Sequence, residues 1–228
     1  AAPAEQRPVV TRRTAGHVIP GESKMKPDLK AAILASGLRD GMTISFHHSF
    51  REGDMVIGQV LTAIRELGIK GLRFAPSAVV NVKSPSVVDF VRDGTIDRIE
   101  ASGIRGQLGD AVLAGEMENP VILRTHGARP HAIEMGRLQI DVAFIAADDY
   151  GNCTGCIGPN ACGAMGYSFV DAHNAGCVIV VTDNLVEYPC VPASISQQYV
   201  DFVVKVDQVG DPEKIGKGAA RLTKNPRD

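Results

Sequence analysis

Short apolar runs rich in β-branched residues alternate along this chain with stretches of helical period, and this alternation constrains the fold more than any other feature. Cys177–Thr182 is the most hydrophobic of the predicted strands. Val56–Leu67 is predicted as a helix, with Val60, Ile64 and Leu67 among its apolar residues. Strands joined by crossover helices form a parallel sheet that is covered on both faces. The sequence therefore predicts an α/β fold with a mainly parallel sheet and helices on both faces.

The other predicted elements fill the chain from residue 28 onward. Strands are expected at 42–46, 72–75, 96–101, 120–124 and 141–146, and helices at 29–41, 86–92, 109–116 and 131–138. The stretch 197–206 fits a helix followed by a strand, with no clear boundary between them. Residues 1–27 are rich in proline and have no apolar period. We therefore expect an extended N-terminal arm at 1–27 and one α/β domain at 28–228.

Composition narrows the class of partner and the compartment. Hydrophobic residues make up 44% of the 228 residues and charged residues 22%, which is ordinary for a globular protein. A net charge of −2 gives no long-range attraction to nucleic acid or to an anionic membrane. No apolar run reaches the 18 to 20 or so residues that a membrane-spanning helix needs. We expect a cytoplasmic protein that binds neither nucleic acid nor membrane.

Three of the five cysteines crowd into one segment, at Cys153, Cys156 and Cys162. An odd number of cysteines in this arrangement is a poor disulfide framework, which favours a reducing compartment. A structural zinc site needs four ligands at recognisable spacing, and a second Cys-x-x-Cys pair is missing from the sequence. We therefore expect no metal site.

Polar residues that follow the predicted strands are the candidates for a functional site, because ligands of open α/β sheets bind outside the carboxyl ends of the strands. Arginine can grip a carboxylate or phosphate with two parallel hydrogen bonds, and histidine can act as a general base or as a donor. Glycines let backbone amides approach an anion closely. The candidates are His47, His48, Arg51, Gly103, Arg105, Gly106, Arg124, His126, Arg129 and Asn152. Alternatively, the arginines are solvated loop residues that pair with nearby acids, and the histidines are ordinary core or surface residues.

Four motifs, in this order along the chain, carry a resemblance to a known family. Ser45–Asp54, Ile99–Gly109, Thr125–His131 and Ala146–Gly155 are similar to the amino-terminal part of the citrate lyase alpha subunit. The resemblance implies a fold of the CoA-transferase type, also called NagB/RpiA/CoA-transferase-like. Members of the family are longer and have a second α/β domain that this sequence lacks.

The resemblance also implies an activity, a citrate CoA-transferase reaction within citrate lyase. The alpha subunit exchanges the acetyl group on an acyl-carrier protein for citrate through a mixed anhydride, which gives citryl-carrier and acetate. A beta subunit then cleaves the citryl thioester to oxaloacetate. The gamma subunit is the carrier and bears a CoA-derived prosthetic group, which CoA thioesters can replace. The implied assembly is a hetero-oligomer of these subunits, and no cofactor is bound covalently to the alpha subunit itself.

With this activity in view, the candidate residues divide into two groups. His47, Gly103, Arg105 and Gly106 are predicted to be catalytic, with backbone amides near the glycines holding the developing oxyanion. The predicted substrate-binding residues are His48, Arg51, Arg124, His126, Arg129 and Asn152. Two other functions fit the same sequence: a CoA-transferase for another carboxylate, or a non-catalytic scaffold that binds the other subunits.

Overall fold

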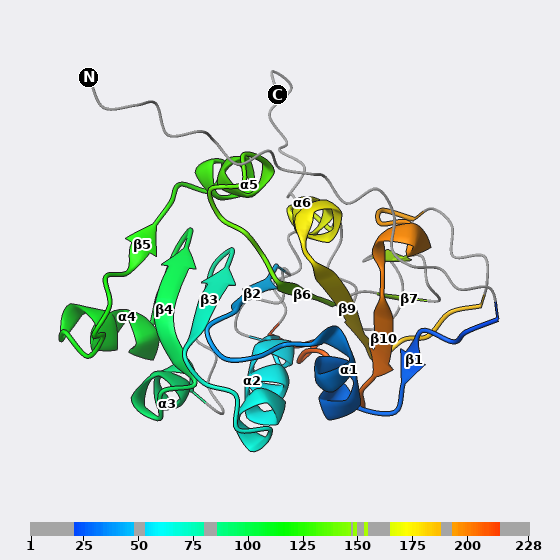
Figure 1. Ribbon diagram of the computed structural model, residues 1–228, viewed down its shortest axis with the longest axis horizontal. Helices are drawn as coiled ribbons and strands as arrows, with labels where there is room; N and C mark the ends of the chain where they lie inside the picture. Colours follow the sequence, from blue (N-terminus) through cyan, green and yellow to red (C-terminus); the bar gives the residue numbers. More distant parts are fainter. Residues whose placement is uncertain are drawn as a thin grey trace.

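A computed structural model describes residues 21–47, 53–79, 86–146, 148–149, 153–154, 165–187 and 193–214 of the 228-residue chain. Its centre is an eight-stranded sheet in the order β1-β10-β9-β6-β2-β3-β4-β5, in which every pairing is parallel (Figure 1). The strands are β1 (Met25–Lys26), β2 (Thr43–Phe46), β3 (Leu72–Pro76), β4 (Ile96–Ala101), β5 (Ile122–Leu123), β6 (Val142–Ala146), β9 (Cys177–Thr182) and β10 (Phe202–Lys205). The predicted α/β class is confirmed.

Six helices of the described chain cover the two faces of this sheet. They are α1 (Leu29–Ser36), α2 (Val56–Glu66), α3 (Val87–Arg92), α4 (Gln107–Leu113), α5 (Ala128–Glu134) and α6 (Ser168–Asn174). Figure 1 shows α5 and α6 on one side of the sheet and α1, α2 and α3 on the other. A short 3-10 helix, η2 (Gln197–Tyr199), precedes β10, and β7 (Asp148–Asp149) pairs with β8 (Cys153–Thr154) in an antiparallel hairpin after β6.

The core consists of two apolar clusters, one on each face of the sheet. Along β9, Ile179 and Val181 pack into the cluster under α1–α4, whereas Val178 and Val180 pack into the cluster under α5 and α6. All six residues of β9 are buried as a result. This two-sided burial is the reason that the strands show no regular alternation of polar and apolar residues.

The structure differs from the predicted elements in several places. Helix α6 and the hairpin of β7 and β8 were not predicted, and α1 ends at Ser36 instead of near residue 41. Helix α5 begins at Ala128 instead of His131, because Pro130 lies within its first turn, where a proline is tolerated. Strand β5 has only two residues, although the sequence predicted a strand at 120–124. Met25–Lys26, expected in the arm, form the edge strand β1 beside β10.

The strand order also shows where the direction of winding reverses. The chain places β3, β4 and β5 successively on one side of β2, and then places β6, β9 and β10 on the other side. The order of the strands therefore reverses between β2 and β6, and ligands of open α/β sheets bind at such a switch point. Of the helices in the described part of the chain, none is long and apolar enough to cross a membrane.

Candidate functional site

His47 follows β2 directly and so lies at the switch point of the sheet. Its imidazole is buried and packs against the ring of Tyr167, with 5.4 Å between ring centroids. The Ser168 hydroxyl donates a hydrogen bond of 2.6 Å to the His47 carbonyl oxygen. The start of α6 is thereby fixed against the end of β2.

Tyr167 also contacts His126, the second predicted histidine. The two rings meet edge to face, with 4.8 Å between centroids. His126 is exposed in the loop between β5 and α5, whereas Tyr167 is half-buried. We call His47, Tyr167 and His126 the His–Tyr–His cluster. It joins three segments far apart in the sequence and supplies two imidazoles and a phenol, which can donate hydrogen bonds to a carboxylate or move a proton.

Gly166 packs directly against this cluster. Its φ is +56°, in the left-handed region, and a Cβ atom added there would lie 2.8 Å from the His47 Nε2 atom. Only glycine fits this position without displacing the imidazole.

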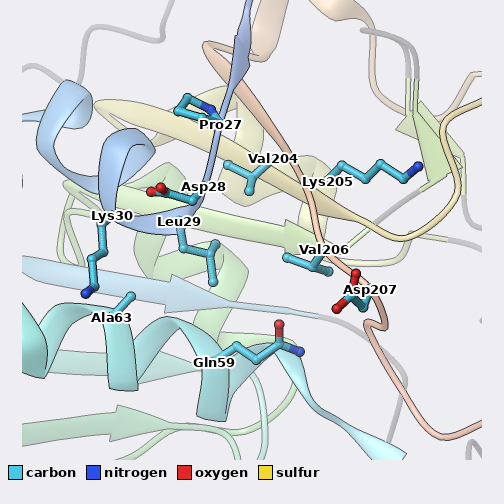
Figure 2. Close-up of a pocket in the computed structure, with 10 residues that line it drawn as sticks. All are labelled: Pro27, Asp28, Leu29, Lys30, Gln59, Ala63, Val204, Lys205, Val206 and Asp207. Atoms are coloured by element: carbon cyan, nitrogen blue, oxygen red, sulfur yellow. The ribbon is translucent and has the colours of Figure 1, made fainter.

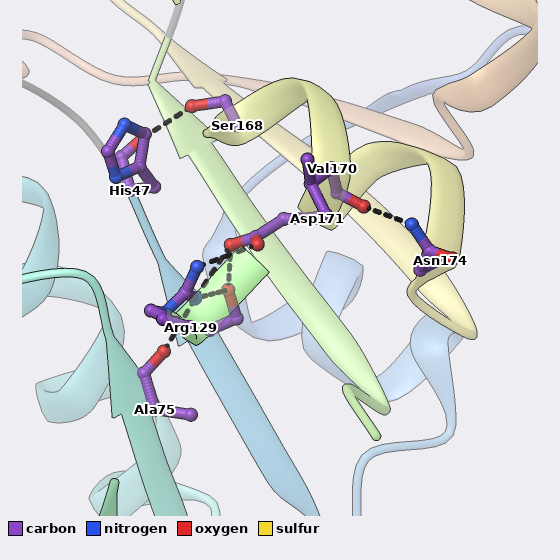
Figure 3. A network of polar contacts seen from close by, with 8 residues as sticks. His47, Ala75, Arg129, Ser168, Val170, Asp171 and Asn174 are labelled. Atoms are coloured by element: carbon purple, nitrogen blue, oxygen red, sulfur yellow. Dashed lines mark hydrogen bonds and ion pairs between the residues drawn. The ribbon is translucent and has the colours of Figure 1, made fainter. Parts of the chain in front are cut away.

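Arg129 differs from its predicted role. It was expected to bind a substrate carboxylate, but its side chain is fully buried beneath the cluster. Its Nη1 and Nη2 atoms donate to the two carboxylate oxygens of Asp171 at 2.9 and 3.0 Å (Figure 3). Nη2 also donates to the Ser45 hydroxyl and to the Ala75 carbonyl oxygen. Because protein groups take these donors and the side chain is shielded from solvent, Arg129 is an internal ion-pair partner in this structure.

Arg124 is also engaged by the protein, but less completely. Its Nε donates to the carboxylate of Glu100, a buried residue near the end of β4. The guanidinium of Arg73 is 3.9 Å from the same carboxylate. About a quarter of the Arg124 side chain is exposed, at 26%. It can present its remaining donors to a ligand while it neutralises Glu100.

The glycine-containing turn after β4 is partly occupied by backbone pairing. The Arg105 amide donates to the Val79 carbonyl, and the Val79 amide donates to the Gly103 carbonyl, each at 3.0 Å. The Arg105 amide is therefore not available to an oxyanion in this structure, and an oxyanion role for the other amides of this turn stays a prediction. Gly106 has φ +63° and is the N-cap residue of α4, directly before the helix begins at Gln107. The Arg105 side chain is exposed, and within the described residues it makes no ion pair.

Three predicted site residues, His48, Arg51 and Asn152, lie outside the described residues, as do Cys156 and Cys162. Among the residues whose placement is described, no group of three or more histidine, cysteine or acidic side chains could hold a metal ion.

A groove of about 450 Å³ opens between α1, α2 and the end of β10 (Figure 2). Asp28, Lys30, Lys205 and Asp207 place opposite charges around it, with apolar residues between them. It shares no residue with the His–Tyr–His cluster, and its charges balance. It shows no preference for an anionic ligand.

Sequence reasoning missed Tyr167, Gly166 and Asp171. Candidates were taken from the turns that directly follow the strands, and the segment between β6 and α6 is long. A signal was nevertheless present, because a helix that connects two parallel strands must begin at their carboxyl edge. The residues that open α6 belong to the same edge of the sheet as His47.

The family model for citrate lyase, alpha subunit (CitF), matches residues 22–228. The citrate lyase alpha chain of Klebsiella pneumoniae is 46% identical over 210 residues, which cover 91% of this chain and 41% of the relative. That of Escherichia coli K12 is 45% identical over the same shares of the two chains. The chain thus spans about two fifths of the length of these curated relatives.

Two solved structures illustrate the structural likeness. A Streptococcus mutans protein, described as an alpha subunit of citrate lyase in complex with citrate, superposes with a TM-score of 0.86 at 46% identity. The match covers 96% of this chain and 44% of that one. Glutaconate coenzyme A-transferase from Acidaminococcus fermentans superposes with a TM-score of 0.59 at 13% identity, over 81% of this chain and 76% of its own. The second likeness concerns the fold alone.

Proposed function

The chain belongs to the citrate lyase alpha subunit family, and we propose that it carries part of the site that exchanges an acetyl group for citrate on an acyl-carrier thioester. The products are citryl-carrier and acetate, and a beta subunit then cleaves the citryl group to oxaloacetate. The proposed setting is a cytoplasmic hetero-oligomer with the beta subunit and the gamma carrier. The CoA-derived group belongs to the carrier and so to the substrate. The observation that carries the proposal is the match over residues 22–228, together with a relative of the same fold that binds citrate.

The proposed exchange has two steps that balance. A citrate carboxylate oxygen attacks the carbonyl carbon of the acetyl thioester, and the carrier thiolate leaves with the electrons of the broken C–S bond. The thiolate then attacks the citryl carbonyl carbon of the mixed anhydride, and acetate leaves. One thioester and one carboxylate are exchanged for another of each, with no net change in protons.

Such a reaction needs donors that hold a tricarboxylate without blocking the oxygen that attacks. We assign this role to the exposed imidazole of His126 and the phenol of Tyr167, which lie together at the carboxyl edge of the sheet. His47 supports Tyr167 from the buried side. The exposed Arg105 and the partly exposed Arg124 are the proposed partners for further carboxylates, as are His48 and Arg51.

The test is acyl exchange in an enzyme complex that contains this chain but lacks the beta subunit, so that citryl-CoA accumulates. We expect acetyl-CoA and citrate to yield citryl-CoA and acetate, detected by mass spectrometry. Malonate and glutaconate serve as competing acids. Faster exchange with one of these acids than with citrate would show that this acid, and not citrate, is the substrate. Binding of the carrier with no exchange for any acid would indicate a scaffold.

A further inference from the structure

We propose that the buried ion pair between Arg129 and Asp171 is a positioning device that holds the three residues of the His–Tyr–His cluster at their mutual distances. The inference rests on the proposed function, because it assigns these residues a part in the exchange of acyl groups. Figure 3 shows the pair beneath His47, between α5, α6 and the strands β2 and β3.

The pair is costly to bury, and stability alone does not account for it. Both side chains are almost fully buried, with 0% and 1% of their surfaces exposed. Removing two charges from water is expensive, and an apolar pair of similar volume is often as stable as a buried ion pair or more stable. Unlike an apolar contact, an ion pair with hydrogen bonds is directional, so it fixes the relative orientation of the two side chains.

Each group in the network is close in the chain to one member of the cluster. Arg129 lies three residues after His126, and its amide donates to the Thr125 carbonyl in the same turn. Asp171 lies one helical turn after Tyr167, and its amide donates to the Tyr167 carbonyl at 3.2 Å. Displacing either charge would therefore shift the turn that carries a ring of the cluster.

The third link runs through β2. Ser45 lies two residues before His47, and alternate residues of a strand face the same side of a sheet. Its hydroxyl donates to the Asp171 carboxylate and accepts a hydrogen bond of 3.0 Å from Arg129. The network thus ties together β2, α5 and α6, and each of these elements lies next to one of the three rings in the chain.

The principal experiment replaces the pair by apolar residues of similar volume, in the double variant Arg129→Met/Asp171→Leu. Measured in the complex that contains this chain, we expect a melting temperature within about 5 °C of wild type, because the desolvation penalty disappears with the charges. We expect kcat for acyl exchange to fall roughly 100-fold, because a displacement of about 1 Å in a site is sufficient for such a loss. The matched control, Arg92→Gln/Glu116→Gln, removes an exposed ion pair on the other face and should change neither quantity.

A spectroscopic readout separates positioning from a purely structural role and does not require activity. The 228-residue chain has six histidines, so its labelled imidazole resonances can be assigned individually. The Tyr167 ring should shift the resonances of His47 and His126, whose centroids are 5.4 and 4.8 Å away. We expect these shifts to collapse toward ordinary values in the double variant.

A stable double variant with wild-type kcat and unchanged imidazole shifts would overturn the proposal. If the double variant does not fold, Ser45→Ala is the test of the proposal, because this variant keeps the ion pair and removes only the hydrogen bonds that link the pair to the Ser45 side chain of β2. We then expect a kcat about tenfold lower, with a changed His47 resonance, and unchanged values would refute the inference. If the wild-type complex exchanges no acetyl group, the proposed function fails by itself, and the imidazole shifts still test the positioning.

Discussion

Replacing Gly166 by alanine tests whether the position of His47 matters for the reaction. Two effects follow from the structure. The backbone there has φ +56°, and an L-residue in this left-handed region is strained by roughly 1 to 2 kcal/mol. The new methyl carbon would also lie 2.8 Å from His47 Nε2, so the ring must retreat by about 0.6 Å to reach an ordinary contact of 3.4 Å.

The size of this displacement sets the expected loss of activity. A misplacement of about 1 Å in a catalytic site can lower the rate roughly 100-fold, so about 0.6 Å predicts a loss of roughly tenfold. A tenfold loss corresponds to about 1.4 kcal/mol of activation free energy. The assay is acyl exchange between acetyl-CoA and citrate, measured as kcat beside a thermal melt of the same preparation.

Gly68→Ala is the matched control for backbone strain. Gly68 has φ +75°, and a Cβ atom there would meet nothing within 4 Å. The backbone strain should lower the melting temperature of both variants by a similar amount, about 3 to 6 °C for 1 to 2 kcal/mol. Only Gly166→Ala should also lose turnover. Equal kcat values in the two variants would refute the role assigned to the position of His47.

Three further predictions concern single side chains. Tyr167→Phe keeps the ring contacts and removes the hydroxyl, so we expect a citrate KM about tenfold or more higher with no change in melting temperature, and an unchanged KM would exclude the phenol as a ligand. Arg124→Gln removes a hydrogen-bond donor from the buried Glu100 carboxylate, so the free energy of unfolding measured in urea should fall by roughly 2 kcal/mol. The double variant Arg124→Gln/Glu100→Gln should recover much of this loss. An equal loss in both variants would argue against the ion pair. Burial tends to raise the pKa of the Asp93 carboxyl, but hydrogen bonds from the Thr95 hydroxyl and amide and the nearby Lys70 ammonium together outweigh it and hold that pKa below its ordinary value. Asp93 therefore stabilises the fold above its unfolded-state pKa and loses this contribution as pH falls through its folded-state pKa, so the stability difference from Asp93→Asn should shrink below about pH 4, whereas a constant difference would contradict this assignment.

The secondary structure was largely readable because its signals are local. The composition of a run such as Cys177–Thr182 predicts a buried strand, and the structure has a strand with the same bounds. The errors also have local causes. The predicted helix at 131–138 began after Pro130, although a proline in the first turn of a helix replaces an amide that has no partner within the helix.

The candidate site was only partly readable. The rule that ligands bind at the carboxyl edge of the sheet selected His47 and His126, and both of these rings contact Tyr167 in the structure. It overlooked Tyr167 because the long segment after β6 separates α6 from the strand that it follows. It also misjudged Arg129, because its sequence neighbours give no hint of Asp171, which lies 42 positions away.

Sequence alone determined the class of fold, the parallel sheet and the edge of the sheet at which the candidate residues were expected, because the alternation of strands and helices is visible in short segments. Tertiary structure decided which of the candidate polar residues are exposed at that edge and which are buried in the interior. Arg129 and His126 lie three residues apart, yet one is fully buried and the other exposed. That difference depends on how α5 rests against α6 and β2, and contacts between segments far apart in the chain leave no pattern in the sequence around either residue.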